Sequence, residues 1–320
     1  MLFAYRPEAG GLIQMQPPAD LKAALWIDLY RPLLNQSADV ARLGLPVPTL
    51  ADMEEIEISN RLYHEDEIDY LTVVLPGEDV AGDQVMSPVC FAVSNARLVT
   101  VRHHTPRPFE NYPARAGKSS LGCSTPDRIF LGLIEEVIGR LADHLEIAGT
   151  GLDKVSRQTY HPGAKGHQQK DLESALSNLG AEGERLGRVR LGLLTLGRAL
   201  NYVDQMLGHR LNTEGLGLVL KGQLRDIEAL EVHADFLSSR LGLMSDATMG
   251  RINLAQNTTV RIVSVVAVLF SPPTLIASLY GMNFDFMPEL AWKLGYPMAL
   301  VVMVGSAVLT YAFFRWKGWL

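Results

Sequence analysis

Two uncharged stretches near the C-terminus decide the architecture: IVSVVAVLFSPPTLIASLY over 262–280 and YPMALVVMVGSAVLTYAFF over 296–314. Each approaches the ~20 apolar residues that a helix needs to cross the ~30 Å hydrocarbon core of a bilayer. A charged side chain at mid-bilayer costs at least ~2.5 kcal/mol, so runs without charge are typical of membrane spans. The short segment between them is a loop at one membrane face. The sequence therefore predicts a two-span hairpin at the end of a largely water-soluble chain.

Composition and charge fit this division. The 320 residues are 48% hydrophobic and 20% charged, which suits one soluble domain followed by a short membrane part. A net charge of −6 argues against a general nucleic-acid binder, and two cysteines make neither a disulfide framework nor a zinc site. The N-terminus lacks the pattern of a signal peptide. Basic residues precede the first span and follow the second, so the positive-inside rule predicts that both termini are cytoplasmic. We expect a multi-pass protein of the inner (plasma) membrane.

The part of the chain before the hairpin changes character near residue 125. Residues 1–125 contain short Val-, Leu- and Thr-rich runs bounded by turn residues, which predict the strands of a cytoplasmic α/β domain. These runs are 11–15, 24–29, 70–75, 89–93 and 98–102. Residues 126–220 show apolar residues at helical spacing on both sides of a polar break at 160–169, which predicts two long antiparallel cytoplasmic helices.

A third helical pattern forms a stalk and runs on into the first span. The remaining predicted segments are the stalk with the first transmembrane helix (221–281, the span at about 261–280), an external loop (282–295), the second transmembrane helix (296–315) and a cytoplasmic tail (316–320). The expected fold class is an α/β cytoplasmic domain with a long helical stalk and two C-terminal transmembrane α-helices.

One face of the third helical pattern carries small, hydroxyl and amide side chains. Its members, at alternating steps of three and four, are Asp246, Gly250, Asn253, Asn257, Val260, Ser264, Ala267, Ser271, Thr274, Ser278 and Gly281. Small residues let membrane helices pack closely, which is one interpretation. The other is a pore lining, which we favour because packing does not require the face to continue to Asp246 in the stalk. One helix cannot enclose a channel, so a pore requires a homo-oligomeric ring.

The chemistry of this face favours Mg²⁺. Within the membrane it offers amides, hydroxyls and carbonyls and no carboxylate, and such groups can bind the water shell that Mg²⁺ keeps. A thiolate or imidazole cluster, which would suit Zn²⁺ or Cu⁺, is missing from this face of the sequence. Asp285 and Glu289 in the outer loop would concentrate cations at the entrance. A hydrophobic constriction at Val260 and Val263 would gate the path by dewetting.

The loop after the first span carries a family signature. Tyr280-Gly281-Met282-Asn283, followed by Phe284 to Leu290 and by Gly295-Tyr296-Pro297, resembles the signature of the CorA family of magnesium transporters, the GMN-motif metal ion transporters. The match extends through both spans to Leu320 and, with Pro272-Pro273-Thr274-Leu275, resembles the proteobacterial branch. The part before the stalk matches only loosely.

The resemblance implies a CorA-like funnel, assembled as a homopentamer whose first spans line the pore. It implies that Gly281, Met282 and Asn283 form the selectivity filter, with Asn283 capturing hydrated Mg²⁺. Thr274, Asn257 and Asp246 match further pore rings of the family. Ser271 and Val260 depart from the large apolar Met or Leu of some relatives, which implies a wider or displaced gate.

The resemblance also implies gating by cytosolic Mg²⁺ bound at acidic residues between subunits. Candidates on the stalk are Asp226, Glu228, Glu231 and Asp235, for which a solvated helix face is the simpler interpretation. The expected cargo is Mg²⁺, with Co²⁺ and Ni²⁺ as further ions, and the expected partners are other copies of the chain, membrane lipid and divalent cations.

Two other functions stay open. One is a Zn²⁺ transporter of the same superfamily, with or without coupling to protons, although Met282 and the following Met-Pro-Glu-Leu favour magnesium. The other is a cytosolic sensor or binding domain that the hairpin merely anchors, which would not need a polar stripe. The sequence shows neither a phosphate loop nor a dinucleotide motif nor a nucleophile–base set, so we expect no enzyme and no organic cofactor.

Overall fold

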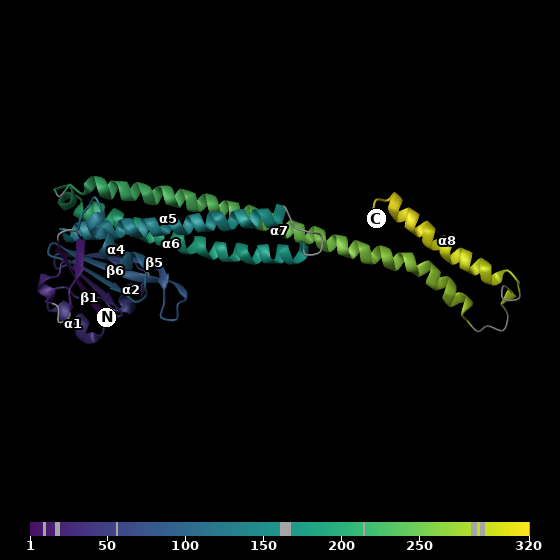
Figure 1. Cartoon of the computed structure of the whole chain (residues 1–320), viewed down its shortest axis with the longest axis horizontal. Coiled ribbons are helices and arrows are strands. Elements are labelled where there is room, and N and C mark those ends of the chain that lie inside the picture. Colours follow the sequence, from purple (N-terminus) through teal and green to yellow (C-terminus); the bar gives the residue numbers. More distant parts are fainter. Residues whose placement is uncertain are drawn as a thin grey trace. The chain divides into compact units, whose positions relative to one another are not determined.

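The computed structural model describes residues 1–8, 11–16, 20–55, 57–160, 168–213, 215–282, 287–288 and 292–319. The chain divides into two compact units (Figure 1). The first unit comprises 1–157 with 177–244, and the second comprises 158–176 with 245–320. The first therefore holds the α/β domain, and the second holds both of the apolar stretches.

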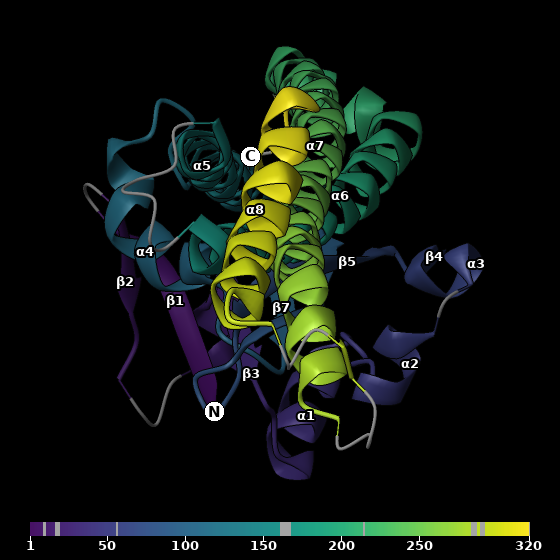
Figure 2. The ribbon, with the colours of Figure 1, turned by 90° about the vertical axis from the view of Figure 1, so that its right-hand side faces the viewer.

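A seven-stranded sheet is the centre of the first unit (Figure 2). Its strands in the order β2-β1-β3-β7-β6-β5-β4 are Gly11–Gln14, Leu2–Glu8, Trp26–Tyr30, Leu98–Arg102, Gln84–Ser94, Ile68–Glu78 and Leu62–Glu65. The paired strands of the described sheet are antiparallel except for β3 and β7, which are parallel. The first eight residues of β5 are all buried, as expected for a strand covered on both faces.

The predicted strands are confirmed, and the structure adds two that the sequence did not predict. The five predicted runs form β2, β3, β5, β6 and β7. The additional strands are β1, whose sequence LFAYRPE contains a proline and two charges, and β4, a four-residue edge strand with the sequence LYHE. Pairing with a neighbouring strand, rather than burial of a whole face, holds each of them in place. Neither therefore has the β-branched, alternating pattern that indicates a strand in a sequence.

Short helices connect the strands. They are η1 (Leu21–Ala23), α1 (Leu34–Ala41), α2 (Leu50–Glu54), α3 (Ile58–Arg61), α4 (Arg107–Arg115) and η2 (Ala116–Lys118). The helix expected from Leu50 is α2. Its N-cap Thr49 accepts a hydrogen bond from the Asp52 backbone N–H, while Asp52 accepts one from the Thr49 N–H at 2.8 Å, which is a reciprocal capping arrangement.

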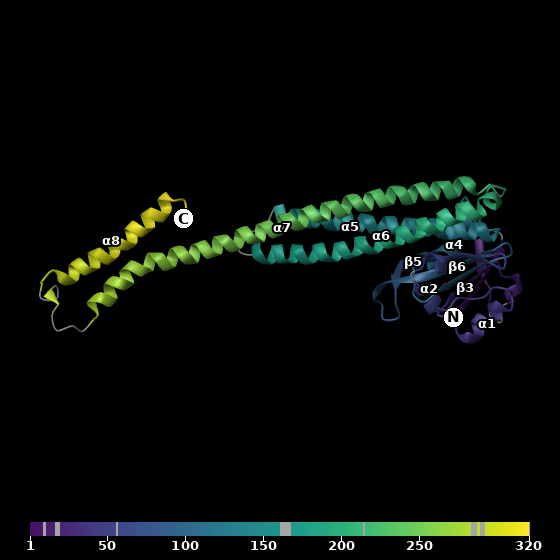
Figure 3. The ribbon, with the colours of Figure 1, turned by 180° about the vertical axis from the view of Figure 1, so that it is seen from behind.

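Four long helices follow: α5 (Pro126–Tyr160), α6 (Gln168–Thr213), α7 (Gly217–Tyr280) and α8 (Gly295–Trp316). Thr125 caps α5 as expected, because its Oγ1 accepts a hydrogen bond from the Arg128 N–H at 3.3 Å. Within the first unit α5, α6 and the first part of α7 lie side by side (Figure 3). Gln223 on α7 donates to the Leu131 carbonyl of α5 at 2.8 Å, which ties two of these helices together.

The break between α6 and α7 is shorter than predicted. We expected the third helical pattern to begin at about Lys221, whereas α7 begins at Gly217. Gly215, with a φ of 75°, turns the chain at the end of α6, and the Leu216 N–H donates to the Leu211 carbonyl at 2.7 Å. Leu216 and Leu220 are buried. Their packing starts the helix in spite of the glycines, which have low helical propensity.

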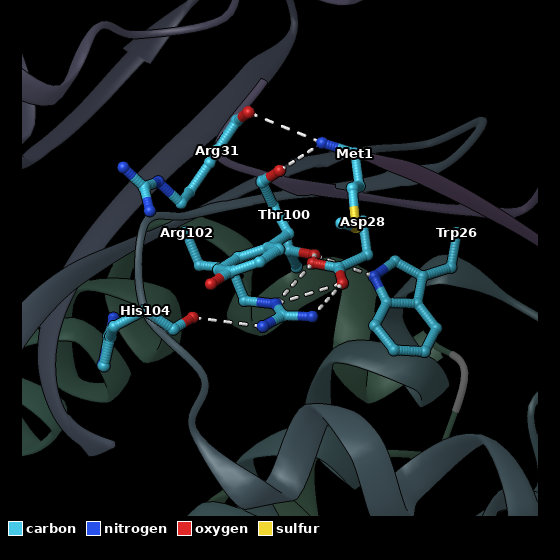
Figure 4. Close-up of polar contacts among 8 residues, drawn as sticks. Met1, Trp26, Asp28, Arg31, Thr100, Arg102 and His104 are labelled. Carbon is cyan, nitrogen blue, oxygen red and sulfur yellow. Dashed lines mark hydrogen bonds and ion pairs between the residues drawn. The ribbon is translucent and has the colours of Figure 1, made fainter. Parts of the chain in front are cut away.

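A buried ion pair joins the parallel strands at the middle of the sheet (Figure 4). Asp28 on β3 accepts hydrogen bonds from the guanidinium of Arg102 on β7, the shortest at 2.8 Å, and another from Thr100 at 2.8 Å. Thr100 in turn accepts from the Trp26 indole N–H at 3.0 Å. The Arg102 guanidinium also lies over the Tyr30 ring, 4.8 Å from its centroid. Asp28 and Arg102 are only 1% and 5% exposed, so each charge depends on the other for compensation.

We predict that Asp28→Asn lowers the free energy of unfolding of the α/β domain by about 3 kcal/mol, because it leaves the buried Arg102 charge without its counter-ion. The matched control is Asp39→Asn. Asp39 pairs with Arg42 at 2.7 Å on the surface, with side chains 49% and 76% exposed, and such a pair is worth at most about 1 kcal/mol. Chemical denaturation of the detergent-solubilised protein, followed by circular dichroism, measures both. Equal losses would contradict this account of the pair.

Candidate ion pathway

The two helices of the predicted hairpin expose their apolar side chains. The most apolar 18-residue windows of α7 and α8 have mean hydropathies of 2.1 and 1.9, and only 6% of each window is buried within the chain. A core helix of a soluble protein would have most of such a window covered by its own chain. Because both windows are also as long as a membrane is thick, a lipid bilayer is the environment that fits them.

The predicted pore face lies uncovered along α7. Every one of its residues from Asp246 to Gly281 is exposed in the single chain, as is Val263. The two valines of the predicted constriction, Val260 and Val263, are 64% and 63% exposed. By contrast, Val265 on another side of the same helix is 3% exposed. The structure therefore leaves the polar stripe available to other copies of the chain or to a pathway between them.

Hydroxyl groups on this face donate to their own helix. Ser264 donates to the Val260 carbonyl at 2.9 Å and Thr274 to the Phe270 carbonyl at 2.7 Å. Such a hydroxyl has its proton satisfied and keeps acceptor lone pairs free. Water molecules that surround a cation present their hydrogens outward. The lining of a path for a hydrated cation therefore needs groups that accept hydrogen bonds.

Pro272 and Pro273 lie within α7 and do not end it, since the helix continues to Tyr280. Each proline removes one backbone N–H donor from the helix, and a kink was expected. Figure 3 shows α7 bending towards its C-terminal end. Thr274 immediately after the prolines is still on the exposed face, so the stripe continues beyond them.

The helix ends where the predicted filter begins. The Gly281 N–H donates to the Ala277 carbonyl at 2.9 Å, which closes the last turn, and Gly281 and Met282 are both exposed. Asn283, Asp285 and Glu289 lie outside the described residues. Their roles at the cation entrance stay predictions.

The acidic residues proposed as a cytosolic sensor do not gather in one chain. Asp226, Glu228 and Asp235 are exposed and Glu231 is half-buried along α7. Asp235 forms an ion pair with Arg190 of α6 at 3.0 Å. Among the described residues, no three His, Cys, Asp or Glu side chains are grouped closely enough to hold a metal ion. A regulatory site at these positions would need ligands from a second subunit, and it stays a prediction.

The structure also contains a cavity that the sequence did not predict. It has a volume of about 420 Å³ and is lined by residues of β5, β6, α4, α5 and α6, among them Arg140, His144, Arg185 and Arg188. The helical spacing of Arg185 and Arg188 on one face of α6 was a signal in the sequence. This spacing alone did not predict a cavity, because the facing residues on α5 are about 40 positions away in the sequence and only the fold brings them together.

Comparison with known proteins decides the family. Residues 22–316 match the family described as CorA-like Mg²⁺ transporter protein. The chain belongs to the CorA-like Mg²⁺ transporter family. It is 36% identical over 327 residues to the magnesium transport protein CorA of Escherichia coli strain K12, and the alignment covers 100% of both chains.

Solved structures share the fold of this chain. The complete CorA magnesium transporter of Methanocaldococcus jannaschii matches with a TM-score of 0.75 at 16% identity, covering 100% of this chain and 99% of that one. The full-length CmaX protein matches with a TM-score of 0.66 at 17% identity, covering 98% and 96%. The predicted fold class, a sheet-containing domain with long helices and two C-terminal apolar helices, is confirmed.

We predict that Ser271→Cys reacts with a charged, membrane-impermeant methanethiosulfonate reagent, whereas Val266→Cys does not. Both positions are exposed in the single chain. They are ~140° apart around the helix axis, so when one faces an aqueous path the other faces protein or lipid. The native thiols Cys90 and Cys123 are both buried, which keeps background labelling low. Mass spectrometry of the labelled protein in liposomes is the measurement. Equal labelling of the two cysteines would contradict the assignment of this face of α7 as the pore lining.

Proposed function

We propose that this CorA-family chain carries Mg²⁺ into the cytoplasm as a passive channel in the inner (plasma) membrane, with both termini in the cytoplasm. The observation that carries the proposal is the exposed face of small, hydroxyl and amide side chains on α7, which continues through the apolar span with Val260 as its large apolar member. The Escherichia coli relative, a magnesium transport protein, aligns over its whole length, which supports the same cargo for this chain.

The assembly we propose is a homopentamer in which one α7 from each subunit faces a central axis. A single helix supplies one wall, and a closed ring of identical subunits supplies the others. In this arrangement the uncovered stripe becomes the lining and the apolar remainder of α7 packs against α8 or lipid.

Selectivity would arise from binding hydrated Mg²⁺ without stripping its water. Mg²⁺ loses its inner waters reluctantly. Rings of Asn283 at the entrance, with Gly281 and Met282, and of Asn257 further along would hydrogen-bond the hydrated ion. Asp285 and Glu289 would raise the local cation concentration outside. Co²⁺ and Ni²⁺, which have the same charge and also bind six waters, are expected to follow the same path.

The membrane potential supplies the driving force. Moving one elementary charge is worth ~2.3 kcal/mol per 100 mV, and a divalent cation gains twice that amount. We propose that the gate is the ring of Val260 and Val263, which are apolar and exposed on α7. Cytosolic Mg²⁺ bound between subunits at acidic residues of α7 would close it.

We predict that liposomes holding the purified protein take up Mg²⁺ under an inside-negative potential and that Asn283→Ala abolishes at least ~90% of this flux, because it removes the amide ring that captures the hydrated ion. Asn201→Ala is the matched control. Asn201 is an exposed residue of α6 whose amide donates a hydrogen bond to the Gly197 carbonyl of its own helix, at 2.8 Å.

A fluorescent Mg²⁺ indicator inside the liposomes measures the flux, with a Zn²⁺ indicator in parallel. Zn²⁺ uptake that follows a proton gradient, with little Mg²⁺ flux, would assign the chain to zinc transport. Absence of flux for either ion at several internal Mg²⁺ concentrations would contradict the channel and leave a membrane-anchored sensor.

We also predict a single species of five subunits when the detergent-solubilised protein is examined by native mass spectrometry. The number five is what the resemblance to the CorA family implies, and a closed ring of identical subunits is what a pore lined by one α7 per subunit requires. A monomer or dimer that still conducts Mg²⁺ would contradict the pentameric pore while leaving the transport activity in place.

A further inference from the structure

The cavity of about 420 Å³ belongs entirely to the first unit and has three walls. The end of β5, the start of β6 and the start of α4 form one wall, α5 forms the second and α6 the third. Its volume falls in the range of small-ligand sites, ~300–1,000 Å³. None of its lining residues is part of the predicted ion pathway.

Positive charge dominates the lining. It contains four arginines, Arg107, Arg140, Arg185 and Arg188, and two glutamates, Glu78 and Glu184, which leaves a net charge of +2 when the histidine is neutral. These arginines come from three different helices, α4, α5 and α6. A cavity with one dominant sign of charge and low-dielectric walls attracts ions of the opposite sign.

The ion pairs of these arginines are loose or local. Arg107 lies 3.9 Å from Glu78 and Arg140 lies 3.6 Å from Asp143, both longer than a good hydrogen bond. Arg185 and Arg188 pair with carboxylates three and four residues earlier on α6, Glu182 and Glu184. Such helix-surface pairs are weak and exchange readily. Each guanidinium therefore has N–H groups to offer to an anion.

His144 lies in the wall between these arginines. It is 9% exposed, and its ring makes no hydrogen bond to any described residue. Burial, together with the nearby positive charges of Arg140 and Arg185, lowers the pKa of His144 to about 4. The ring is therefore neutral at pH 7, with one N–H donor that has no partner in the described structure. The ring nitrogens reach the accessible surface of the cavity, where they can meet water or a ligand.

We propose that this cavity binds a soluble, multiply charged phosphate anion, held by the guanidinium groups of Arg140, Arg185 and Arg188 and by the His144 ring. Arginine's planar fork matches phosphate oxygens with two parallel hydrogen bonds. A ligand held in this way would link α5 to α6 within the first unit. The site stands independently of the ion pathway, because it requires neither the pore face nor the proposed pentamer.

The test is isothermal titration calorimetry of the full-length, detergent-solubilised protein with sodium pyrophosphate and, separately, ATP, in buffer free of divalent cations. We expect saturable binding of at least one of the two. The double variant Arg140→Gln/Arg188→Gln should weaken it at least ~10-fold, since each lost guanidinium removes charged hydrogen bonds. Arg188→Lys keeps the charge and loses the fork, so it should give an intermediate loss.

Arg190→Gln is the matched control. Arg190 is the next arginine along α6, is exposed and pairs with Asp235 of α7 at 3.0 Å, outside the cavity. It should change the affinity less than ~2-fold, as expected for a partner of a surface ion pair. Thermal unfolding of each variant without ligand shows whether the fold is kept, and a loss of affinity that only parallels a loss of stability would overturn the proposal.

Three results would overturn the proposal directly. They are the absence of saturable heat with both pyrophosphate and ATP, equal weakening by Arg190→Gln and the double variant, and binding of short-chain phosphatidic acid with none of either soluble anion. The last result would assign the phosphate chemistry of the cavity to a lipid headgroup. Selective loss in the double variant, with the control unchanged, would establish the site.

Discussion

The constraint on which the rest of the molecule depends is that the second half of α7 finds little apolar cover among the described residues of its own chain. In the first unit, α7 buries Ile227, Ala234 and Leu237 against the neighbouring helices. Beyond residue 250 its valines, leucines and phenylalanines are exposed almost all round. Exposure of that area to water would be costly, so this part of the helix requires lipid or further copies of the chain. One continuous helix therefore has a first part that packs in a water-soluble unit and a second part that requires lipid or protein around it.

Within the span, two hydroxyl groups of the polar stripe need no hydrogen-bond partner from another helix. Ser264 and Thr274 donate to carbonyls of the preceding turn, so their protons are satisfied in the isolated chain. Their hydroxyl oxygens can still accept hydrogen bonds from outside the helix. The other exposed side chains of this part of the helix are mostly branched and aliphatic. Such a face can pack closely against a neighbouring helix or line a path for a hydrated cation. The arrangement of the subunits in the oligomer decides which of these two roles it has.

The first unit contains charged side chains in two different environments. Asp28 and Arg102 are buried, bidentate and fully compensated, so the pair serves the packing of β3 against β7. The arginines of the cavity are partly exposed and come from α4, α5 and α6. Arg107 and Arg140 lie beyond good hydrogen-bond distance from their carboxylate partners, and Arg185 and Arg188 pair within their own helix. Burial raises the electrostatic cost of a missing partner, which is why the first arrangement stabilises a fold and the second leaves donors for a ligand.

The sequence by itself determined the two spans, the α/β character of the first domain, the long helices and the stripe on α7. Each follows from a local rule: a charge-free run of this length can only be helical in lipid, and helical or alternating spacing sets which side chains share a face. It missed β1 and β4 and placed the start of α7 too late, because pairing and the packing of Leu216 and Leu220 override weak local propensity. Only the tertiary structure produced the buried Asp28–Arg102 pair and the arginine cavity. Both join residues that are tens of positions apart in the chain, and the positions of such residues in space are set by the packing of strands and helices and by no local pattern.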